Sequence, residues 1–301
     1  MIRVALPKLI RGGLVTTTTY SRRERGAIAA YSAMYGATMA LPPRRDFYPQ
    51  FPATVTAVQD LAPAFRRVTL QAAPLRGLTL LGPDEYVGLY LPSPGVDLYL
   101  PEDSLNPRPA LSRLPVEVRP DLRWYTIRAH RRAHGEVDID IVSKGHDGPG
   151  ARWIGRVRVD DSIGLRIGSA PYASAPRNGH HVLLADETGL PGALAVLDAS
   201  ARLPTSARPQ LTVLLEVPGL CLHRDGAHRA GIDVVYRGEG APGSALLPAL
   251  SDLALGCPDY AWVCAEAATI AGARRHLVKE RCMSRRKVMA SGFWKVGSER
   301  L

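Results

Sequence analysis

Short runs of alternating apolar and polar residues follow one another through the first half of the chain, from Phe47 onward. Each run is rich in β-branched or aromatic side chains and ends at turn-forming residues, which is the pattern of short strands. The expected strands are residues 54–58, 67–70, 86–91, 124–128 and 136–142. Between the third and fourth strands, residues 92–120 contain seven prolines and are expected to form a surface excursion. Strands at this spacing predict an antiparallel barrel.

After a linker at residues 170–179, continuous apolar runs alternate with helix-like segments. Buried strands are expected at 181–185, 211–216, 233–237 and 260–264, and helices from about residue 190 to 202, at 245–255 and at 267–282. Strands that alternate with helices predict a parallel sheet covered on both faces. The predicted fold is therefore a two-domain β plus α/β chain, with the barrel over residues 46–170 and the α/β domain over residues 171–301.

Residues 1–45 show little periodicity and are predicted to form a basic, poorly ordered extension with room for a short helix at 27–40. They carry eight basic residues against one acidic residue, and residues 274–301 carry nine against two. Both ends therefore have a net charge of +7, while the rest of the chain is negative by 4 because the total is +10. Such ends attract an anionic surface or ligand, or are simply solvated. Nucleic acid is an unfavoured partner, because the basic runs lack interleaved aromatic residues apart from Phe293 and Trp294.

Composition limits the class of protein further. With 301 residues, of which 46% are hydrophobic and 22% charged, the chain is typical of a soluble protein with room for two cores. No run of about eighteen apolar residues occurs, so no membrane span is expected. The four cysteines show no C-x-x-C spacing. The absence of this spacing argues against a zinc site or an iron–sulfur cluster and indicates free thiols in a reducing cytoplasm.

Candidate chemistry begins at the strand Arg123-Trp124-Tyr125-Thr126-Ile127-Arg128. Side chains alternate along a strand, so Arg123 and Tyr125 share one face, where a guanidinium suits a phosphate and a phenol ring suits an isoalloxazine. Thr126 could reach a flavin edge through its amide or hydroxyl group. The residues alone fit an ordinary half-exposed strand equally well.

Two further segments suit the binding of a nucleotide. Gly148-Pro149-Gly150-Ala151 is expected to open a helix, and the free amides of a helix N-terminus bind anions. Asp186-Glu187-Thr188-Gly189 follows the first apolar strand of the second domain, at the strand end where open α/β sheets bind ligands. No G-x-G-x-x-G fingerprint is present there, so a dehydrogenase site of that type is not expected.

Taken in order, these segments resemble the siderophore-interacting protein family, the flavin-dependent ferric-siderophore reductases related to ferredoxin reductases. The resemblance extends from about residue 46 to residue 297. Its motifs are residues 82–87, 123–128, 138–142, 148–153, 186–191, 262–266 and 292–297. None of them is specific alone, but their order is.

The resemblance implies an FAD-binding barrel and a nicotinamide-binding α/β domain. Electrons are then expected to pass from NADH or NADPH through FAD to a small-molecule substrate, the iron(III) of a ferric siderophore. The cofactor-binding residues that it implies are Arg123, Tyr125, Thr126, Arg128, Lys144, Gly148, Gly150, Ala151 and Trp153 on the flavin side, and Asp186, Glu187, Thr188, Glu266 and Trp294 on the nicotinamide side. No catalytic residue and no metal ligand of the protein is predicted.

The chain departs from the family pattern at functional positions. Gly88 replaces a usual lysine, Lys144-Gly145 replaces His-Gly, and Pro149-Gly150-Ala151 replaces Pro-Ala-Ser. Other changes place Ala170 in the turn near the flavin and Ala265 near the nicotinamide, where a methyl group is expected to obstruct a close ring approach. These changes support a second hypothesis, a flavoenzyme of secondary metabolism that keeps FAD but has lost siderophore and possibly nicotinamide binding. A third hypothesis is a non-enzymatic flavin-binding or nucleic-acid-binding protein.

Overall fold

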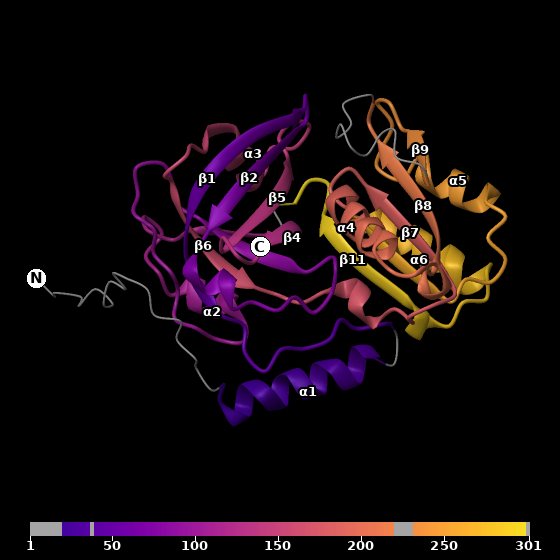
Figure 1. Cartoon of the computed structure of the whole chain (residues 1–301), viewed down its shortest axis with the longest axis horizontal. Coiled ribbons are helices and arrows are strands. Elements are labelled where there is room, and N and C mark those ends of the chain that lie inside the picture. Colours follow the sequence, from indigo (N-terminus) through magenta and orange to yellow (C-terminus); the bar gives the residue numbers. More distant parts are fainter. Residues whose placement is uncertain (1–19, 37–38, 220–230, 299–301) are drawn as a thin grey trace, which may run out of the picture.

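The computed structural model describes residues 20–36, 39–219 and 231–298, which form two domains side by side (Figure 1). The first domain is a closed barrel in the order β1-β2-β5-β4-β3-β6 with antiparallel neighbours throughout. Its strands are β1 (Gln50–Ala62), β2 (Phe65–Gln71), β3 (Tyr86–Leu91), β4 (Asp121–Arg131), β5 (Glu136–Val142) and β6 (Ser162–Ile167). The predicted barrel is confirmed, and β6 is a strand that the sequence pattern did not indicate.

Alternation along the strands fills the barrel. Val87, Leu89 and Ile127 are at most 1% exposed and point into one apolar core with residues of the other strands. Helix α3 (Pro149–Arg156) contributes Trp153 to the same core. The β6 sequence was missed because Gly164 and Arg166 interrupt its apolar alternation.

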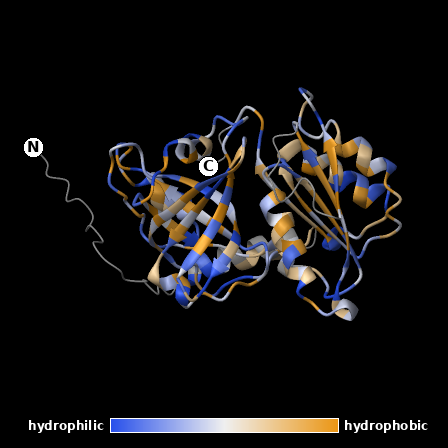
Figure 2. Ribbon diagram, turned by 45° about the horizontal axis from the view of Figure 1, so that its top comes forward, coloured by the Kyte–Doolittle hydropathy of each residue, from blue (hydrophilic) through white to orange (hydrophobic). Residues whose placement is uncertain are grey.

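The second domain has a five-stranded parallel sheet in the order β11-β10-β7-β8-β9. The strands are β7 (His180–Asp186), β8 (Gln210–Val217), β9 (Ile232–Tyr236), β10 (Tyr260–Glu266) and β11 (Val288–Trp294). Helix α4 (Leu190–Ala201) packs on one face, and α5 (Leu246–Asp252) and α6 (Ala267–Lys279) pack on the other. Figure 2 shows the apolar residues concentrated on the strands inside both domains. The predicted α/β domain is confirmed, with β11 as an additional strand at the sheet edge.

Helix α4 lies between the parallel sheet and the barrel (Figure 1). An ion pair of 2.7 Å joins Arg128 of β4 to Asp198 of α4, and Trp262 Nε1 of β10 donates to Asp84 Oδ2 at 2.8 Å. Apolar residues of the barrel, Phe65 among them, pack into the same cluster as the α4 side chains. The two domains therefore share an interface that contains both apolar and polar contacts.

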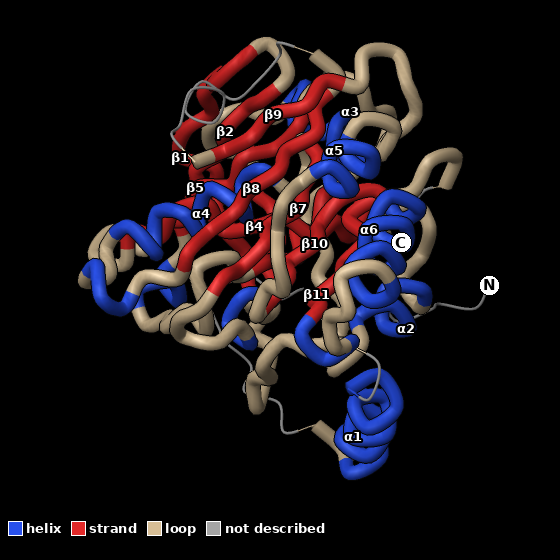
Figure 3. The backbone as a smooth tube through the Cα atoms, turned by 90° about the vertical axis from the view of Figure 1, so that its right-hand side faces the viewer, coloured by secondary structure: helices blue, strands red, loops and turns tan. Residues whose placement is uncertain are grey.

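The segment predicted as a poorly ordered extension is partly folded. Residues 1–19 lie outside the described part of the chain, but α1 (Arg22–Gly36) runs along the edge of the molecule (Figure 3). The helix starts earlier than predicted because Ser21 and Glu24 form a capping box, in which Glu24 N donates to Ser21 Oγ at 3.2 Å and Ser21 N donates to Glu24 Oε2 at 2.9 Å. After this helix, Arg45 contacts the barrel domain through an ion pair with the buried Glu85.

The proline-rich segment 92–120 is more than a loose excursion. It contains α2 (Pro107–Ser112), and its leucines pack with Tyr90 and Leu122 in a small apolar cluster. Arg166, 2% exposed, donates to Asp103 Oδ1 at 3.2 Å and to the Ser104 carbonyl at 2.5 Å. The segment is thus fastened to the outer face of the barrel. Among the described residues, no helix is long and apolar enough to cross a bilayer.

Candidate functional site

Strand β4 and helix α3 together form the flavin side of the predicted site. Tyr125 lies directly over the first turn of α3, so close that a Cβ atom on Gly150 would overlap the tyrosine hydroxyl. Arg123 stands beside it, with its Cγ atom 3.9 Å from the same Cβ position. The structure therefore brings together Arg123, Tyr125 and the Gly148–Ala151 turn, as predicted.

The side chain of Arg123 has an unused donor. It is 14% exposed, and its Nη1 atom donates to the Leu122 carbonyl at 2.8 Å. Its Nη2 atom is buried and makes no hydrogen bond to any described residue, with Asp121 Oδ1 3.7 Å away. Because a buried donor without an acceptor is costly, the atom is suited to an anionic ligand.

The start of α3 offers further donors to the same ligand. Gly148 is the N-cap residue and Pro149 occupies the first turn, but no side chain caps the helix. The first amides of such a helix carry partial positive charge and bind phosphate groups. Ala151 supplies only its amide. The guanidinium nitrogen without a hydrogen bond and the uncapped turn together fit the pyrophosphate of FAD.

Thr126 and Arg128 point from the opposite face of β4, toward the second domain. Thr126 is 5% exposed, and its Oγ1 atom lies 3.5 Å from the Cβ position of Gly192 in α4. Arg128 is occupied by Asp198, although its buried Nε atom has no hydrogen-bond partner among the described residues. These two predicted site residues therefore lie in the domain interface rather than at the α3 turn.

Lys144 and Trp153 are the other two residues predicted for the flavin side. Lys144 is exposed in the loop before α3. Trp153 is 3% exposed and packs in the barrel core, so its side chain has almost no surface to offer a cofactor. In this structure Trp153 is a packing residue, and its cofactor role stays a prediction.

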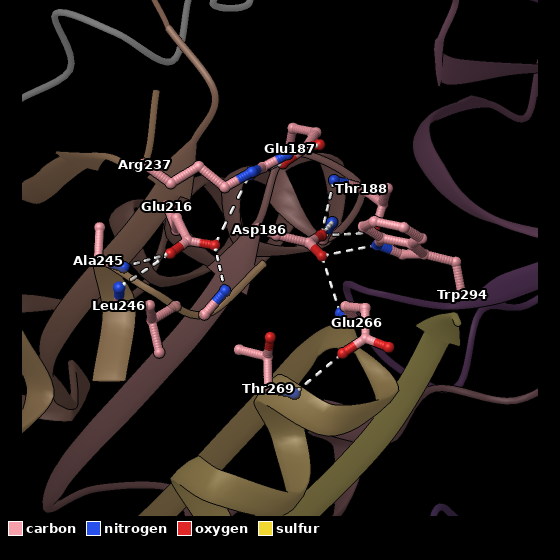
Figure 4. A network of polar contacts seen from close by, with 12 residues as sticks. Asp186, Glu187, Thr188, Glu216, Arg237, Ala245, Leu246, Glu266, Thr269 and Trp294 are labelled. Atoms are coloured by element: carbon pink, nitrogen blue, oxygen red, sulfur yellow. Dashed lines mark hydrogen bonds and ion pairs between the residues drawn. The ribbon is translucent and has the colours of Figure 1, made fainter. Parts of the chain in front are cut away.

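The residues predicted for the nicotinamide side belong to a network of carboxylates at the carboxyl ends of β7, β8 and β10 (Figure 4). Asp186 Oδ1 accepts from the amide and hydroxyl of Thr188 at 2.9 and 2.6 Å. Its Oδ2 atom accepts from Trp294 Nε1 and from the Glu266 amide, both at 2.8 Å. Burial, together with the charge of Glu187, raises the pKa of Asp186 to about 6. The structure thus assembles all five residues predicted for this side.

Glu187 is held by an arginine and a histidine. Arg237 donates to both of its carboxylate oxygens at 2.8 and 2.6 Å, and His146 Nε2 lies 3.3 Å from Oε1. Burial alone would raise the pKa of Glu187, but the hydrogen bonds from Arg237 and then His146 outweigh it and lower the pKa to about 2. Glu187 is therefore ionised at neutral pH.

The carboxylates of Glu216 and Glu266 accept hydrogen bonds from backbone amides. Glu216 is fully buried and accepts from the amides of Gly243, Ala245 and Leu246 at 2.7 to 3.0 Å. Glu266 caps α6 by accepting from the Ala268 and Thr269 amides. All four carboxylates at the strand ends, those of residues 186, 187, 216 and 266, are at most 5% exposed. Glu216 is thus unavailable as the acidic residue that binds a ribose in dinucleotide folds.

Three of these residues were not predicted as part of the site. Glu216 and Arg237 end the predicted strands 211–216 and 233–237, so the strand-end rule used for Asp186 could have found them. His146 stands in a loop that carries no pattern, and only the tertiary structure brings it to Glu187.

Another buried carboxyl group lies between the domains. Asp84 is 2% exposed and accepts from the Tyr172 amide at 3.0 Å in addition to Trp262. Burial raises the pKa of Asp84 to about 7. Its motif was recognised in the sequence, but its role in the interface was not.

Three departures from the family pattern lie at buried or closely packed positions. A Cβ atom on Gly88 would lie 2.8 Å from Leu122 and 3.1 Å from Trp124, so neighbouring side chains fill the space above this glycine. Ala265 and Ala170 are fully buried. The methyl group of Ala265 faces no open surface, and the expected obstruction of a ring stays a prediction.

The described residues contain no group of three or more His, Cys, Asp or Glu side chains arranged to hold a metal ion. Cys257, Cys264 and Cys282 are free thiols, and Cys221 lies outside the described residues. Burial raises the pKa of the Cys264 thiol. This cysteine is a packing residue of β10 in the second domain core.

Comparison with known families covers both domains. The description siderophore-interacting FAD-binding domain matches residues 54–172, and the description siderophore-interacting protein matches residues 178–297. The boundary between these matches falls in the linker between the barrel and the parallel sheet.

Individual relatives are more distant. An uncharacterized protein of Mycobacterium tuberculosis is 28% identical over 188 residues, 61% of this chain and 64% of that protein, so the match spans less than two thirds of the relative. The ferric vibriobactin reductase of Vibrio cholerae is 27% identical over 186 residues, 60% of this chain and 67% of that protein. A siderophore utilization protein from T. fusca has a similar structure, with a TM-score of 0.67 and 28% identity over 84% of this chain and 95% of that one.

Proposed function

The chain belongs to the siderophore-interacting protein family, and from this membership we propose that it is an FAD-dependent oxidoreductase that passes electrons from NADH or NADPH to chelated iron(III). The observation that carries the proposal is the position of Arg123 Nη2, a buried donor that makes no hydrogen bond to a described residue, on the same side as the uncapped first turn of α3. Both are donors that a pyrophosphate would satisfy.

In this proposal Arg123 and the amides of residues 148–151 hold the pyrophosphate of FAD, and the Tyr125 ring orients the isoalloxazine. Bound FAD supplies the redox chemistry, which is the acceptance of a hydride and the release of single electrons. Thr126 lies where β4 meets α4 and Trp262, so it would mark the edge of the flavin nearest the second domain. Iron(II) is held more weakly than iron(III) by hard oxygen ligands, so reduction releases the metal from its chelator.

The nicotinamide side is proposed at Asp186, Glu187, Thr188, Glu266 and Trp294. The ionised Glu187 and its partner Arg237 set the charge of this side, and Trp294 presents an aromatic ring beside it. Support comes from the position of these residues at the carboxyl ends of parallel strands. Anaerobic titration with each nucleotide in turn distinguishes NADH from NADPH as the donor.

Anaerobic titration tests this function directly. The protein should acquire a flavin spectrum on adding FAD, lose absorbance near the flavin maximum on adding NADH or NADPH, and regain it on adding ferric chelates. A protein that gains no flavin spectrum rules out the proposal. If the flavin is reduced but no ferric chelate reoxidises it, the proposed oxidoreductase activity stands and the proposed iron(III) substrate is wrong.

One observation favours a second candidate, a flavoenzyme that acts on a different and less anionic molecule of secondary metabolism. Leu122 and Trp124 fill the space above Gly88, so no cation stands at the position where the family usually has a lysine. Trp124 is 39% exposed and packs edge-to-face on Tyr86 at 5.3 Å, which gives this surface an aromatic character. FAD that stays oxidised under both nicotinamides, but is reduced by dithionite, would favour this candidate.

A further inference from the structure

His146 is a residue of the barrel domain that touches the nicotinamide side. Its Nε2 atom lies 3.3 Å from Glu187 Oε1, and its ring packs edge-to-face on Trp294 with the centroids 4.6 Å apart and the planes at 87°. The side chain is 18% exposed. We call the contact of His146, Glu187 and Trp294 the His146 bridge.

The bridge residue stands on the same loop as the flavin turn. His146 lies between β5 and α3, two residues before the N-cap Gly148. Gly145, directly before it, has a φ of 82°, a conformation that few residues other than glycine adopt. The loop therefore joins a side chain directed at the second domain to the amides proposed to hold the pyrophosphate.

The bridge covers the end of β7. Trp294 also donates to Asp186, and both Asp186 and Glu187 are at most 5% exposed. A nicotinamide ring that approaches these residues must displace the indole or the imidazole ring. Since one edge-to-face contact and one hydrogen bond hold His146, this displacement requires little free energy.

Other contacts hold the domains together. Arg128 pairs with Asp198, and Asp84 accepts from Trp262, both in the domain interface. Loss of the His146 contact therefore leaves the arrangement of the domains intact. The bridge is suited to local opening rather than to a domain movement.

We propose that the His146 bridge closes the nicotinamide side of the site and must open before the electron donor binds. The inference rests on the proposed function, because it assumes that NADH or NADPH binds at the end of β7. His146 then acts as a gating residue and takes no part in the chemistry. Its loss should strengthen donor binding without changing the rate of reduction once the donor is bound.

The test uses the full chain loaded with FAD and four variants. His146→Ala removes both contacts, His146→Phe keeps the ring on Trp294, and His146→Gln keeps a donor for Glu187. His134→Ala is the matched control, because His134 is exposed in the turn between β4 and β5. Anaerobic stopped-flow reduction over a range of NADH and NADPH concentrations separates the dissociation constant from the limiting rate.

His146→Ala should lower the dissociation constant of the donor by roughly fivefold to 150-fold, the range expected for losing a ring contact and a hydrogen bond. The limiting rate should stay unchanged, and the Phe and Gln variants should fall between Ala and wild type. Independently of activity, amide hydrogen exchange in the FAD-free protein should be faster in His146→Ala than in His134→Ala over residues 143–150 and 290–298.

Two results would overturn the inference in different ways. If the donor reduces FAD in the wild-type protein, but His146→Ala binds the donor as weakly as the wild type or more weakly, the bridge does not gate the site and the proposed function stands. If neither nicotinamide reduces either protein while dithionite does, the proposed donor is wrong and the inference falls with it.

Discussion

Arg123 and Arg128 stand on one strand, yet they have different neighbours. Five positions separate them, so the alternation of β4 places them on opposite faces. Arg123 meets the α3 turn with a nitrogen that makes no hydrogen bond to a described residue, whereas Arg128 meets Asp198 in the domain interface. At the scale of the residue, the groups that face each arginine therefore decide what its side chain does.

Arg123→Ala should weaken FAD binding. A charged hydrogen bond contributes about 1.5 to 3 kcal/mol, so the dissociation constant of FAD should rise by roughly tenfold to a hundredfold. Fluorescence titration with FAD measures the change. Arg132→Ala, in the exposed turn after β4, is the control and should bind FAD as the wild type does. Equal affinity in both variants would place the pyrophosphate elsewhere.

Arg237→Gln should destabilise the second domain at neutral pH. The pKa of Glu187 is about 2 in the folded protein, below its ordinary value of 4.5, so its paired charge stabilises the fold above pH 4.5 and this contribution is lost as pH falls through 2. Removing one partner of a buried pair costs about 3 to 5 kcal/mol. Urea unfolding should show the difference from wild type shrinking between pH 7 and pH 3.

The control for this prediction is Arg202→Gln, at an exposed position after α4, which should leave stability within about 0.5 kcal/mol of wild type. A constant difference across pH in Arg237→Gln would mean that the guanidinium acts by packing and not through the charge of Glu187.

At the scale of the element, α3 has two glycines in different surroundings. Gly150 lies under the Tyr125 hydroxyl in the first turn, while nothing lies within 4 Å of a Cβ atom on Gly155 in the second. The first glycine permits a close approach of β4 to the helix. The second only lowers helix propensity.

The pair Gly150→Ala and Gly155→Ala tests this difference. Gly150→Ala should destabilise the FAD-free protein by about 1 to 3 kcal/mol, because the added methyl group displaces the Tyr125 ring. Gly155→Ala should stabilise it by about 0.5 to 1 kcal/mol. Thermal unfolding distinguishes them, and a stabilising Gly150→Ala would show that Tyr125 moves away from the turn at no cost.

At the scale of the whole molecule, the domain interface contains a carboxyl group that titrates near neutral pH. The folded-state pKa of Asp84 is about 7, above the ordinary value of 3.8, because burial penalises the charge. A raised pKa means that the folded state binds the proton more tightly. The contribution of Asp84 to stability is therefore complete below about pH 3.8 and is lost as pH rises to 7.

Asp84→Asn should flatten this dependence. Relative to wild type, the variant should gain stability between pH 5 and pH 7.5, on the order of 1 kcal/mol for each pH unit below 7. Urea unfolding at the two pH values measures the gain. An unchanged difference would mean that the Asp84 carboxyl is already ionised at pH 5, with Trp262 and Tyr172 compensating its burial.

Much of the fold was accessible from the sequence. Alternating apolar residues predicted five of the six barrel strands, and continuous apolar runs predicted four of the five parallel strands. Strand β6 was missed because Gly164 and Arg166 break its alternation, and β11 because Ser291 and Gly292 interrupt its apolar run. Helix α1 began at a capping box that was not considered. The site was predicted as two motif groups. The structure brings Arg123 and Tyr125 to the turn at residues 148–151 and assembles the five residues of the second group, whereas Thr126 and Arg128 lie in the domain interface.

The sequence by itself determined which residues form strands and in what order the motifs follow, because both depend on local periodicity and on the chemistry of side chains. Only the tertiary structure decided which charges meet. Glu187 is 50 residues from Arg237 and 41 from His146 in the chain, and no local pattern contains such a pairing. Burial by itself raises the pKa of a carboxylate. Glu187 is buried and still ionised only because folding brings these two side chains to it.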